Sequence, residues 1–185
     1  MSANLNKLKG FSLVELFAAL SIISLIAVMS LPTIGQVRDK QRLKSAVQHL
    51  QASLNLARSL AIKRGESISV CAQDPASTTA KCMLPGLGNG EWQKGWLIYS
   101  DLNNNQQIDG TEKILSATGA IPSVTIRSSS KKSRVKLSAF GASILSNQTW
   151  EICLPKSSKT SSIKRGYRLI LSSPGQIRPV TMESC

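Results

Sequence analysis

The residues best placed to bind an ion lie between positions 101 and 112. Oxygen-bearing side chains occupy the first, third, fifth, ninth and twelfth positions of this segment: Asp101, Asn103, Asn105, Asp109 and Glu112. This is the ligand spacing of an EF-hand Ca²⁺ loop. That loop needs glycine at its sixth position, where this chain has Gln106, and a flanking pair of helices that the sequence does not predict. The pattern therefore favours a polar hairpin turn, and weak Ca²⁺ binding remains open.

Few residues are suited to acid–base or covalent catalysis. The 185-residue chain has one histidine, His49, and its 10 Asp and Glu residues are scattered. His49 falls within a helical pattern, so we expect a surface or packed histidine rather than a member of a catalytic triad. We therefore predict that the chain is not an enzyme, and that it holds no metal and no cofactor.

The four cysteines predict disulfides rather than a zinc site. Cys71, Cys82, Cys153 and Cys185 form no Cys-x-x-Cys pair and have no histidine nearby, although structural zinc sites normally use such pairs. Four cysteines allow three pairings. We favour Cys71 with Cys82, which staples a short loop, and Cys153 with Cys185, which ties down the C-terminal tail. Disulfides indicate an exported, oxidising compartment.

Positive charge is concentrated in the last third of the sequence. The chain has 23 Lys and Arg against 10 Asp and Glu, and residues 127–185 hold eleven of these cations against two Glu. Such a region predicts a polyanionic partner, because phosphates bound by Lys and Arg release counterions whatever the base sequence. The alternative is a solvated face, or one that meets acidic neighbouring subunits.

A long helix is predicted over residues 12–64. Residues 16–37 carry no charge and residues 16–31 are almost entirely apolar, and the uncharged stretch is long enough to cross a hydrocarbon core of about 30 Å. From residue 43 onward, apolar residues recur at three- and four-residue spacing and so share one helical face. Gly65 predicts the end of the helix. We expect residues 11–36 to lie in a membrane or filament core, and the amphipathic half to pack into a head.

The residues at the start of this helix form an ordered motif, Lys9-Gly10-Phe11-Ser12-Leu13-Val14-Glu15-Leu16. The motif resembles the class III signal of type IV pilins and type II secretion pseudopilins. The resemblance implies that a prepilin peptidase removes residues 1–10 as a leader, cutting after Gly10, and that Phe11 is N-methylated. It also implies that Glu15 neutralises the amino terminus of a neighbouring subunit during assembly. Pro32 matches the helix-kinking proline of these proteins.

The chain from Glu66 onward predicts short strands separated by polar turns. The expected strands are 67–72, 96–100, 113–117, 124–127, 135–139, 150–154 and 167–172. A long N-terminal helix packed on an antiparallel sheet gives an α+β fold, with the head spanning residues 37–185. We expect Trp92, Trp96 and Trp150 to pack in the core rather than to stack on bases.

The head resembles a narrower family. Trp92-Gln93-Lys94-Gly95-Trp96-Leu97-Ile98-Tyr99-Ser100-Asp101, with the Asn run that follows it, is similar to the GspH/FimT family of minor pilins. The FimT branch implies binding of DNA during natural transformation, through a Gly-Arg-x-Arg motif in the C-terminal tail. Here that stretch is Gly175-Gln176-Ile177-Arg178. Gln176 replaces the first Arg, so Arg178 alone carries the resemblance.

These observations predict a minor type IV pilin that is held in the inner membrane with its head in the periplasm, and then enters an extracellular filament. Its expected partners are double-stranded DNA, other major and minor pilins, the prepilin peptidase and the inner membrane. The candidate DNA-binding residues are Lys131, Lys132, Arg134, Lys164, Arg165, Arg168, Gln176 and Arg178. The alternatives are a structural minor pilin that primes pilus assembly, and a GspH-like pseudopilin of a type II secretion system.

Overall fold

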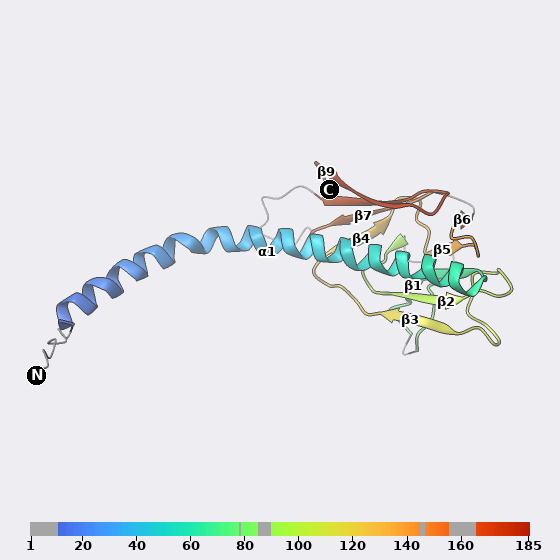
Figure 1. Ribbon diagram of the computed structural model, residues 1–185, viewed down its shortest axis with the longest axis horizontal. Coiled ribbons are helices and arrows are strands. Elements are labelled where there is room, and N and C mark those ends of the chain that lie inside the picture. Colours follow the sequence, from blue (N-terminus) through green and yellow to red (C-terminus); the bar gives the residue numbers. More distant parts are fainter. Residues whose placement is uncertain (1–10, 78, 85–89, 145–146, 156–165) are drawn as a thin grey trace, which may run out of the picture.

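One helix dominates the molecule. The computed structural model describes residues 11–77, 79–84, 90–144, 147–155 and 166–185, with the backbone alone at residues 27–34. Helix α1 (Leu13–Arg64) has 52 residues, close to the predicted range, and is about 78 Å long at 1.5 Å per residue. Its first half projects from the head as a gently curved stalk, and its second half lies along the head (Figure 1).

Local sequence accounts for both ends of α1. Ser12 has an extended backbone, and its carbonyl accepts the N–H of Glu15 at 3.0 Å. The Glu15 carboxylate lies in the first turn, where the helix dipole favours negative charge. At the other end, Gly65 adopts a left-handed conformation with φ of 66° and donates its N–H to the Ala61 carbonyl at 2.9 Å. Glycine adopts this conformation without the steric cost of a Cβ, so the helix ends where the sequence predicts.

The stalk exposes apolar side chains over the half that lies farther from the head. Residues 11–26 are all exposed, and their large hydrophobic members are Phe11, Leu13, Val14, Leu16, Phe17, Leu20, Ile22, Ile23, Leu25 and Ile26. Within the part of the chain that the structure describes, no helix is both long and apolar enough to count as a membrane span.

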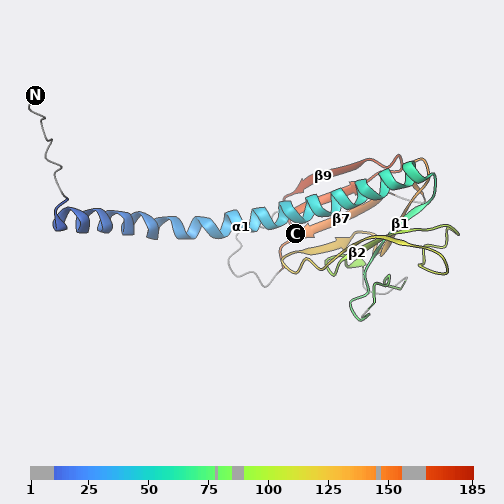
Figure 2. The ribbon, with the colours of Figure 1, turned by 60° about the horizontal axis from the view of Figure 1, so that its bottom comes forward.

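Two antiparallel sheets form the head, whereas the sequence analysis expected one. The five-stranded sheet has the order β3-β2-β1-β5-β6 and the four-stranded sheet has the order β4-β7-β8-β9. The first contains β1 (Ile68–Ala72), β2 (Trp96–Ser100), β3 (Ile114–Thr118), β5 (Arg134–Leu137) and β6 (Ser143–Ile144). The second contains β4 (Thr125–Ser128), β7 (Gln148–Cys153), β8 (Gly166–Leu171) and β9 (Ile177–Met182). Figure 2 shows α1 running along both sheets.

The core lies between α1 and the inner faces of the two sheets. Helix residues at three- and four-residue spacing are buried there with residues of β1, β2, β5, β7 and β8. Leu50 and Leu54 of α1 have no exposed surface. Trp92, Trp96 and Trp150 are also fully buried, as expected, and the rings of Trp92 and Trp150 meet edge to face with centroids 5.4 Å apart. Tryptophan therefore fills the space between the sheets and is not available for stacking on bases.

Both favoured disulfides are present. Cys71 bonds to Cys82 and Cys153 bonds to Cys185, with Cα atoms 5.6 Å and 5.9 Å apart respectively. The second bond joins the end of β7 to the C-terminus, three residues past β9. A Cβ on Gly166 would overlap the Sγ of Cys185, so glycine at the start of β8 leaves room for this disulfide.

Seven of the predicted strands agree with the structure to within two residues at each end. The prediction missed β6, which has only two residues, and β9, which contains Pro179. Proline lacks an N–H and is tolerated at a sheet edge. Since β9 pairs only with β8, Pro179 occupies such an edge.

The packing of α1 predicts different costs for two leucines of the same helix. Leu54 is fully buried and Leu56 is 43% exposed. Leu54→Ala should lower the free energy of unfolding by about 2–5 kcal/mol because it leaves a cavity. Leu56→Ala, the matched control, should cost below about 1 kcal/mol. Urea unfolding followed by circular dichroism measures both, and equal losses would contradict this packing.

Candidate functional site

Arg178 lies on β9 immediately after a tightly held hairpin turn. In this turn, residues 172–176, the N–H of Gly175 donates to the Ser172 carbonyl at 2.8 Å, and the N–H of Ser172 donates to the Gln176 carbonyl at 3.0 Å. The Ser173 N–H donates to Oδ1 of Asn147 at 2.9 Å. The Ser173 carbonyl accepts the N–H of Ser143 at 2.9 Å. Gln176 and Arg178 are therefore presented from a backbone fixed by neighbouring segments.

Helix α1 reaches the same turn through Arg58. Its Nη2 donates to the Pro174 carbonyl at 3.2 Å. Gly175 has φ of 78°, and a Cβ at this position would overlap the carbonyl oxygen of Gly141. Glycine is thus required both for the left-handed backbone and for the close approach of the two turns. The sequence analysis singled out Gly175 by resemblance, and its structural role is to let this turn pack against Gly141.

The strand register places three arginines on the outer face of the four-stranded sheet. Arg127 of β4 pairs with Glu151 of β7, and Glu151 pairs with Arg168 of β8. Arg168 pairs with Val180, two residues beyond Arg178 on β9. Directly paired residues project to one face, and diagonal neighbours lie about 7–8 Å apart. Leu169 and Leu171 alternate with Arg168 and point into the core, so these arginines point away from α1. We call Arg127, Arg168 and Arg178 the basic face.

The arginines of the basic face differ in their ionic partners. Nη2 of Arg168 lies 3.1 Å from Oε1 of Glu151, and Nη2 of Arg127 lies 3.7 Å from Oε1 of Glu91. Both side chains remain substantially exposed, at 44% and 63%. Arg178 is exposed and takes part in no ion pair among the described residues. An exposed ion pair contributes about 0–1 kcal/mol, so a phosphate can compete for Arg168 and Arg127 as well.

Lys131 and Lys132 lie in the loop after β4, at one corner of the same sheet. The Ser129 N–H donates to the Thr149 carbonyl at 2.9 Å, which extends the pairing of β4 with β7. Both lysines are exposed, and the Lys132 carbonyl accepts the indole N–H of Trp92 at 3.1 Å. Their backbone is therefore anchored beside the sheet. Lys164 and Arg165, the other predicted pair, lie outside the described residues.

Arg134 occupies a different environment from the basic face. It belongs to β5 of the five-stranded sheet and is half-buried. Its guanidinium donates to the carbonyls of Gln106 and Met83, the latter at 3.0 Å. Arg134 thus holds two loops onto the sheet, and the structure does not bring it together with Arg168 and Arg178.

The oxygen-rich segment 101–112 connects β2 to β3 as a polar hairpin loop, and its carboxylates are engaged within the head. Asp101 is fully buried and accepts the hydroxyl of Ser69 at 2.6 Å and the N–H of Gln106 at 3.2 Å. Glu112 accepts the Leu102 N–H at 2.8 Å. Among the described residues, no group of three His, Cys, Asp or Glu side chains is placed to hold a metal ion.

A buried tyrosine, Tyr99, packs against this loop through Ile108. Burial, and then the negative charge of Asp101, raise the pKa of the Tyr99 hydroxyl well above its ordinary value. Tyr99 packs with Leu97 and the Cys71–Cys82 disulfide in a second, smaller apolar cluster. The group therefore stays neutral over the physiological range and acts as a packing residue.

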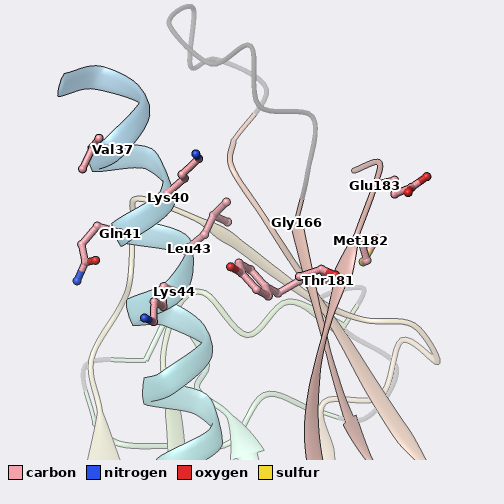
Figure 3. Close-up of a pocket in the computed structure, with 10 residues that line it drawn as sticks. Val37, Lys40, Gln41, Leu43, Lys44, Gly166, Thr181, Met182 and Glu183 are labelled. Atoms are coloured by element: carbon pink, nitrogen blue, oxygen red, sulfur yellow. The ribbon is translucent and has the colours of Figure 1, made fainter. Parts of the chain in front are cut away.

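A groove lies at the neck of the head, between α1 and the ends of β8 and β9. It has a volume of about 610 Å³. Figure 3 shows Leu43 extending from α1 toward the strands, with Thr181 and Met182 opposite. Lys40 and Lys44 belong to its helical side and Glu183 to the strand side. The groove is distinct from the basic face.

The assembly residues predicted from the leader motif lie at the far end of the stalk. Phe11 precedes α1 and is 84% exposed, and Glu15 is exposed in the first turn. Gly10 lies outside the described residues.

The architecture is that of a pilin, with an extended N-terminal helix whose second half packs on antiparallel sheets. The sequence profile of the GspH family, described as type II transport protein GspH, matches residues 46–175. The chain therefore belongs to the GspH family, as its sequence resemblance indicated.

Solved structures of a minor pilin share this fold. A crystal structure of the type IV minor pilin FimU of Pseudomonas aeruginosa PAO1 matches with a TM-score of 0.56 and 21% identity, over 79% of this chain and 96% of that one. A second crystal form gives 0.54 and 22%, over 77% and 99%. A search of curated protein sequences found no match.

Two residues of this region were not predicted as site residues. The sequence analysis included Arg127 only in the net charge of residues 127–185. Because successive strand residues point to opposite faces, its position next to the buried Ile126 on β4 could have placed it on an outer face. The bond from Arg58 to Pro174 spans 116 residues, and no local sequence signal foretells it.

The contact between the two turns predicts a specific cost for Gly175→Ala. Gly65→Ala is a matched control, because Gly65 also has positive φ but has no atom within 4 Å of the added Cβ. The control should lose about 1–2 kcal/mol from backbone strain alone. Gly175→Ala should lose more, since the turn must also move away from Gly141. Thermal unfolding compares the two, and an equal loss in both would contradict the contact.

Proposed function

We propose that this protein is a minor pilin that enters a type IV pilus and binds extracellular double-stranded DNA for uptake in natural transformation. The observation that carries the proposal is the basic face, on which exposed Arg168 and Arg178 lie diagonally adjacent on neighbouring strands. Lys131 and Lys132 extend the positive surface at the corner of the sheet. The proposed role is binding and assembly rather than catalysis.

The chemistry of this face suits a duplex of any sequence. Arginine presents a planar fork of donors that fits phosphate oxygens, and it remains charged at physiological pH. Contacts to phosphate fix position without reading bases, and they release counterions. DNA arriving from outside has no fixed sequence, so recognition of its backbone is what capture requires.

The stalk supports assembly into a filament. Its apolar side chains from Phe11 to Ile26 are exposed, and a surface of this kind needs lipid or other helices around it. In the proposed sequence of events, residues 11–36 hold the protein in the inner membrane with its head in the periplasm. The prepilin peptidase removes residues 1–10, Phe11 is methylated, and the stalk then packs among other pilins.

Two other roles use the same fold without DNA. The description of the GspH family favours a pseudopilin of a type II secretion filament. The likeness to FimU favours a minor pilin, including one that primes pilus assembly. In both roles the basic face would contact other proteins, so a direct measurement of DNA binding separates them from the main proposal.

Arg178→Ala should weaken binding to labelled double-stranded DNA by about tenfold at low salt, because it removes a charged hydrogen-bond donor. The slope of log affinity against log salt should fall by about 0.9 for each phosphate that the variant no longer neutralises. Fluorescence anisotropy with the full chain in a non-ionic detergent measures both quantities. Arg178→Lys should keep much of the affinity, since it keeps the charge.

Lys113→Ala is the control for charge alone, because Lys113 is exposed beside β3 on the other sheet. Its affinity should change little. A second variant, Lys164→Ala with Arg165→Ala, tests the predicted pair that lies outside the described residues and should also bind more weakly. If neither Arg178→Ala nor this double variant loses affinity, the DNA interface is wrongly placed. If the folded wild-type protein does not bind DNA at low salt, the DNA-binding role itself is wrong.

Glu15→Ala should block incorporation into filaments while leaving the head folded. Without the carboxylate, a neighbour's amino terminus is buried unpaired, at a cost of about 3–5 kcal/mol. Immunoblots of sheared filaments and of the membrane fraction measure incorporation, and the variant should accumulate in the membrane. Glu183→Ala, which removes an exposed carboxylate from the head, is the control. Normal amounts of Glu15→Ala in filaments would refute the assembly role.

A further inference from the structure

The most exposed large hydrophobic side chain of the described protein lies on the head rather than on the stalk. Phe140 is 89% exposed, whereas the three tryptophans are fully buried. An exposed phenylalanine leaves its apolar ring in water, which is unfavourable unless a partner covers it. Phe140 lies in the turn between β5 and β6, and neither the stalk nor the basic face includes it.

The turn that carries Phe140 is rigidly built. Ser138 donates its N–H to the Ala142 carbonyl at 2.8 Å, and its own carbonyl accepts the Gly141 N–H at 2.7 Å. The Ser138 hydroxyl accepts the Ala142 N–H at 3.2 Å. Gly141 has φ of 74°, which completes the turn. The ring of Phe140 is thus held outward by a fixed backbone, so a ligand that covers it need not first order the loop.

The same turn lies between the end of α1 and the turn that precedes Arg178. A Cβ on Gly141 would lie 2.7 Å from Cδ1 of Ile62, and the Gly141 carbonyl abuts Gly175. We call the last turn of α1, the turn 138–142 and the turn 172–176 the tip. Lys63 and Arg64 are exposed in the last turn of α1, where Nη1 of Arg64 lies 3.4 Å from Oε1 of Glu66, and Arg178 follows the other turn. Cations therefore lie on both chain segments that adjoin the turn of Phe140.

We propose that the tip binds unpaired nucleotides, at the ends or single-stranded tails of DNA, with Phe140 stacking on a base. This inference rests on the proposed function and extends it. Single strands are typically held by aromatic rings that stack on bases and by cations that follow the phosphates. Bases inside a duplex and at a blunt end are paired and stacked on a neighbour, so an unpaired tail offers the free base that Phe140 needs. The tip then favours single-stranded tails, and the basic face binds the adjoining duplex.

A nucleotide suits the tip better than a protein surface does. The exposed large apolar side chains of the tip are Phe140 and Ile62, and the exposed cations Lys63 and Arg64 follow Ile62 on α1. Stable protein interfaces bury about 1,200–2,000 Å² and have apolar centres, which this small, charged surface does not offer. A single ring with flanking cations matches one base and its phosphates.

The test compares three labelled probes with the full chain in a non-ionic detergent: a blunt duplex, the same duplex with a short single-stranded tail, and the single strand alone. Wild-type protein should bind the tailed duplex more tightly than the blunt one. Phe140→Ala should lower affinity for the tail and for the single strand by about tenfold and leave the blunt duplex nearly unchanged. Phe140→Trp should retain the preference because its ring also stacks. Leu102→Ala, in an exposed loop outside the tip, should change nothing.

Each other outcome has a definite meaning. If the wild-type protein does not distinguish the probes, or if Phe140→Ala weakens all three equally, the inference is wrong. Unchanged DNA binding by Phe140→Ala, with reduced recovery of other pilins bound to it, would assign Phe140 to a subunit contact and also overturn the inference. If the wild-type protein binds the tailed probe and the single strand but not the blunt duplex, the proposed function is wrong and the inference about the tip stands. If it binds none of the three probes, both the proposed function and the inference are wrong.

Discussion

The structure depends on the burial of one face of α1 against two sheets. Leu50, Leu54, Ala57 and Ala61 follow the three- and four-residue spacing of a helix and have no exposed surface. Because the helix is rigid, burying this stripe fixes both its position and its rotation. Arg58 then has to meet the turn 172–176, and the unburied first half has to project as a stalk. The same packing therefore sets the position of the exposed stalk and of the turns at the far end of the head.

Short contacts join α1 to the turns beside the basic face. Arg58 binds the Pro174 carbonyl, and Gly141 fits between α1 and Gly175. Both glycines have positive φ, and a Cβ on Gly175 would push the two turns apart, whereas a Cβ on Gly141 would push its turn away from Ile62 and Arg58 of α1. The turns before Arg178 and around Phe140 are consequently fixed relative to each other. A preorganised surface binds with a smaller loss of conformational entropy than a mobile tail does.

Four described cations of the C-terminal third form two pairs with different physical roles. Arg134 and Lys136 lie on β5 beneath the loop 101–112, where they bind the Gln106 carbonyl and Oδ1 of Asn104. Arg168 and Arg178 lie on the other sheet and face solvent. Net charge treats these residues alike, but Arg178 has no ionic partner among the described residues and Arg168 has an exposed pair with Glu151, so the second group is better placed to attract phosphate. The positive charge that this protein exposes therefore depends on which residues of each strand point to solvent, as well as on how many cations the sequence contains.

The sequence by itself determined the features that depend on local interactions. The extent of α1, its end at Gly65 and seven strands follow from periodicity and turn residues, whereas the sequence allowed three disulfide pairings and only favoured the one that the structure contains. Only the tertiary structure decided that the head has two sheets, that the Pro-containing segment after Gly175 forms edge strand β9, and that Arg127 joins Arg168 and Arg178. It also separated Arg134 from them and brought the turn that carries Phe140 against Gly175. These features depend on contacts between residues far apart in the chain, which register and helix packing select and local sequence patterns do not encode.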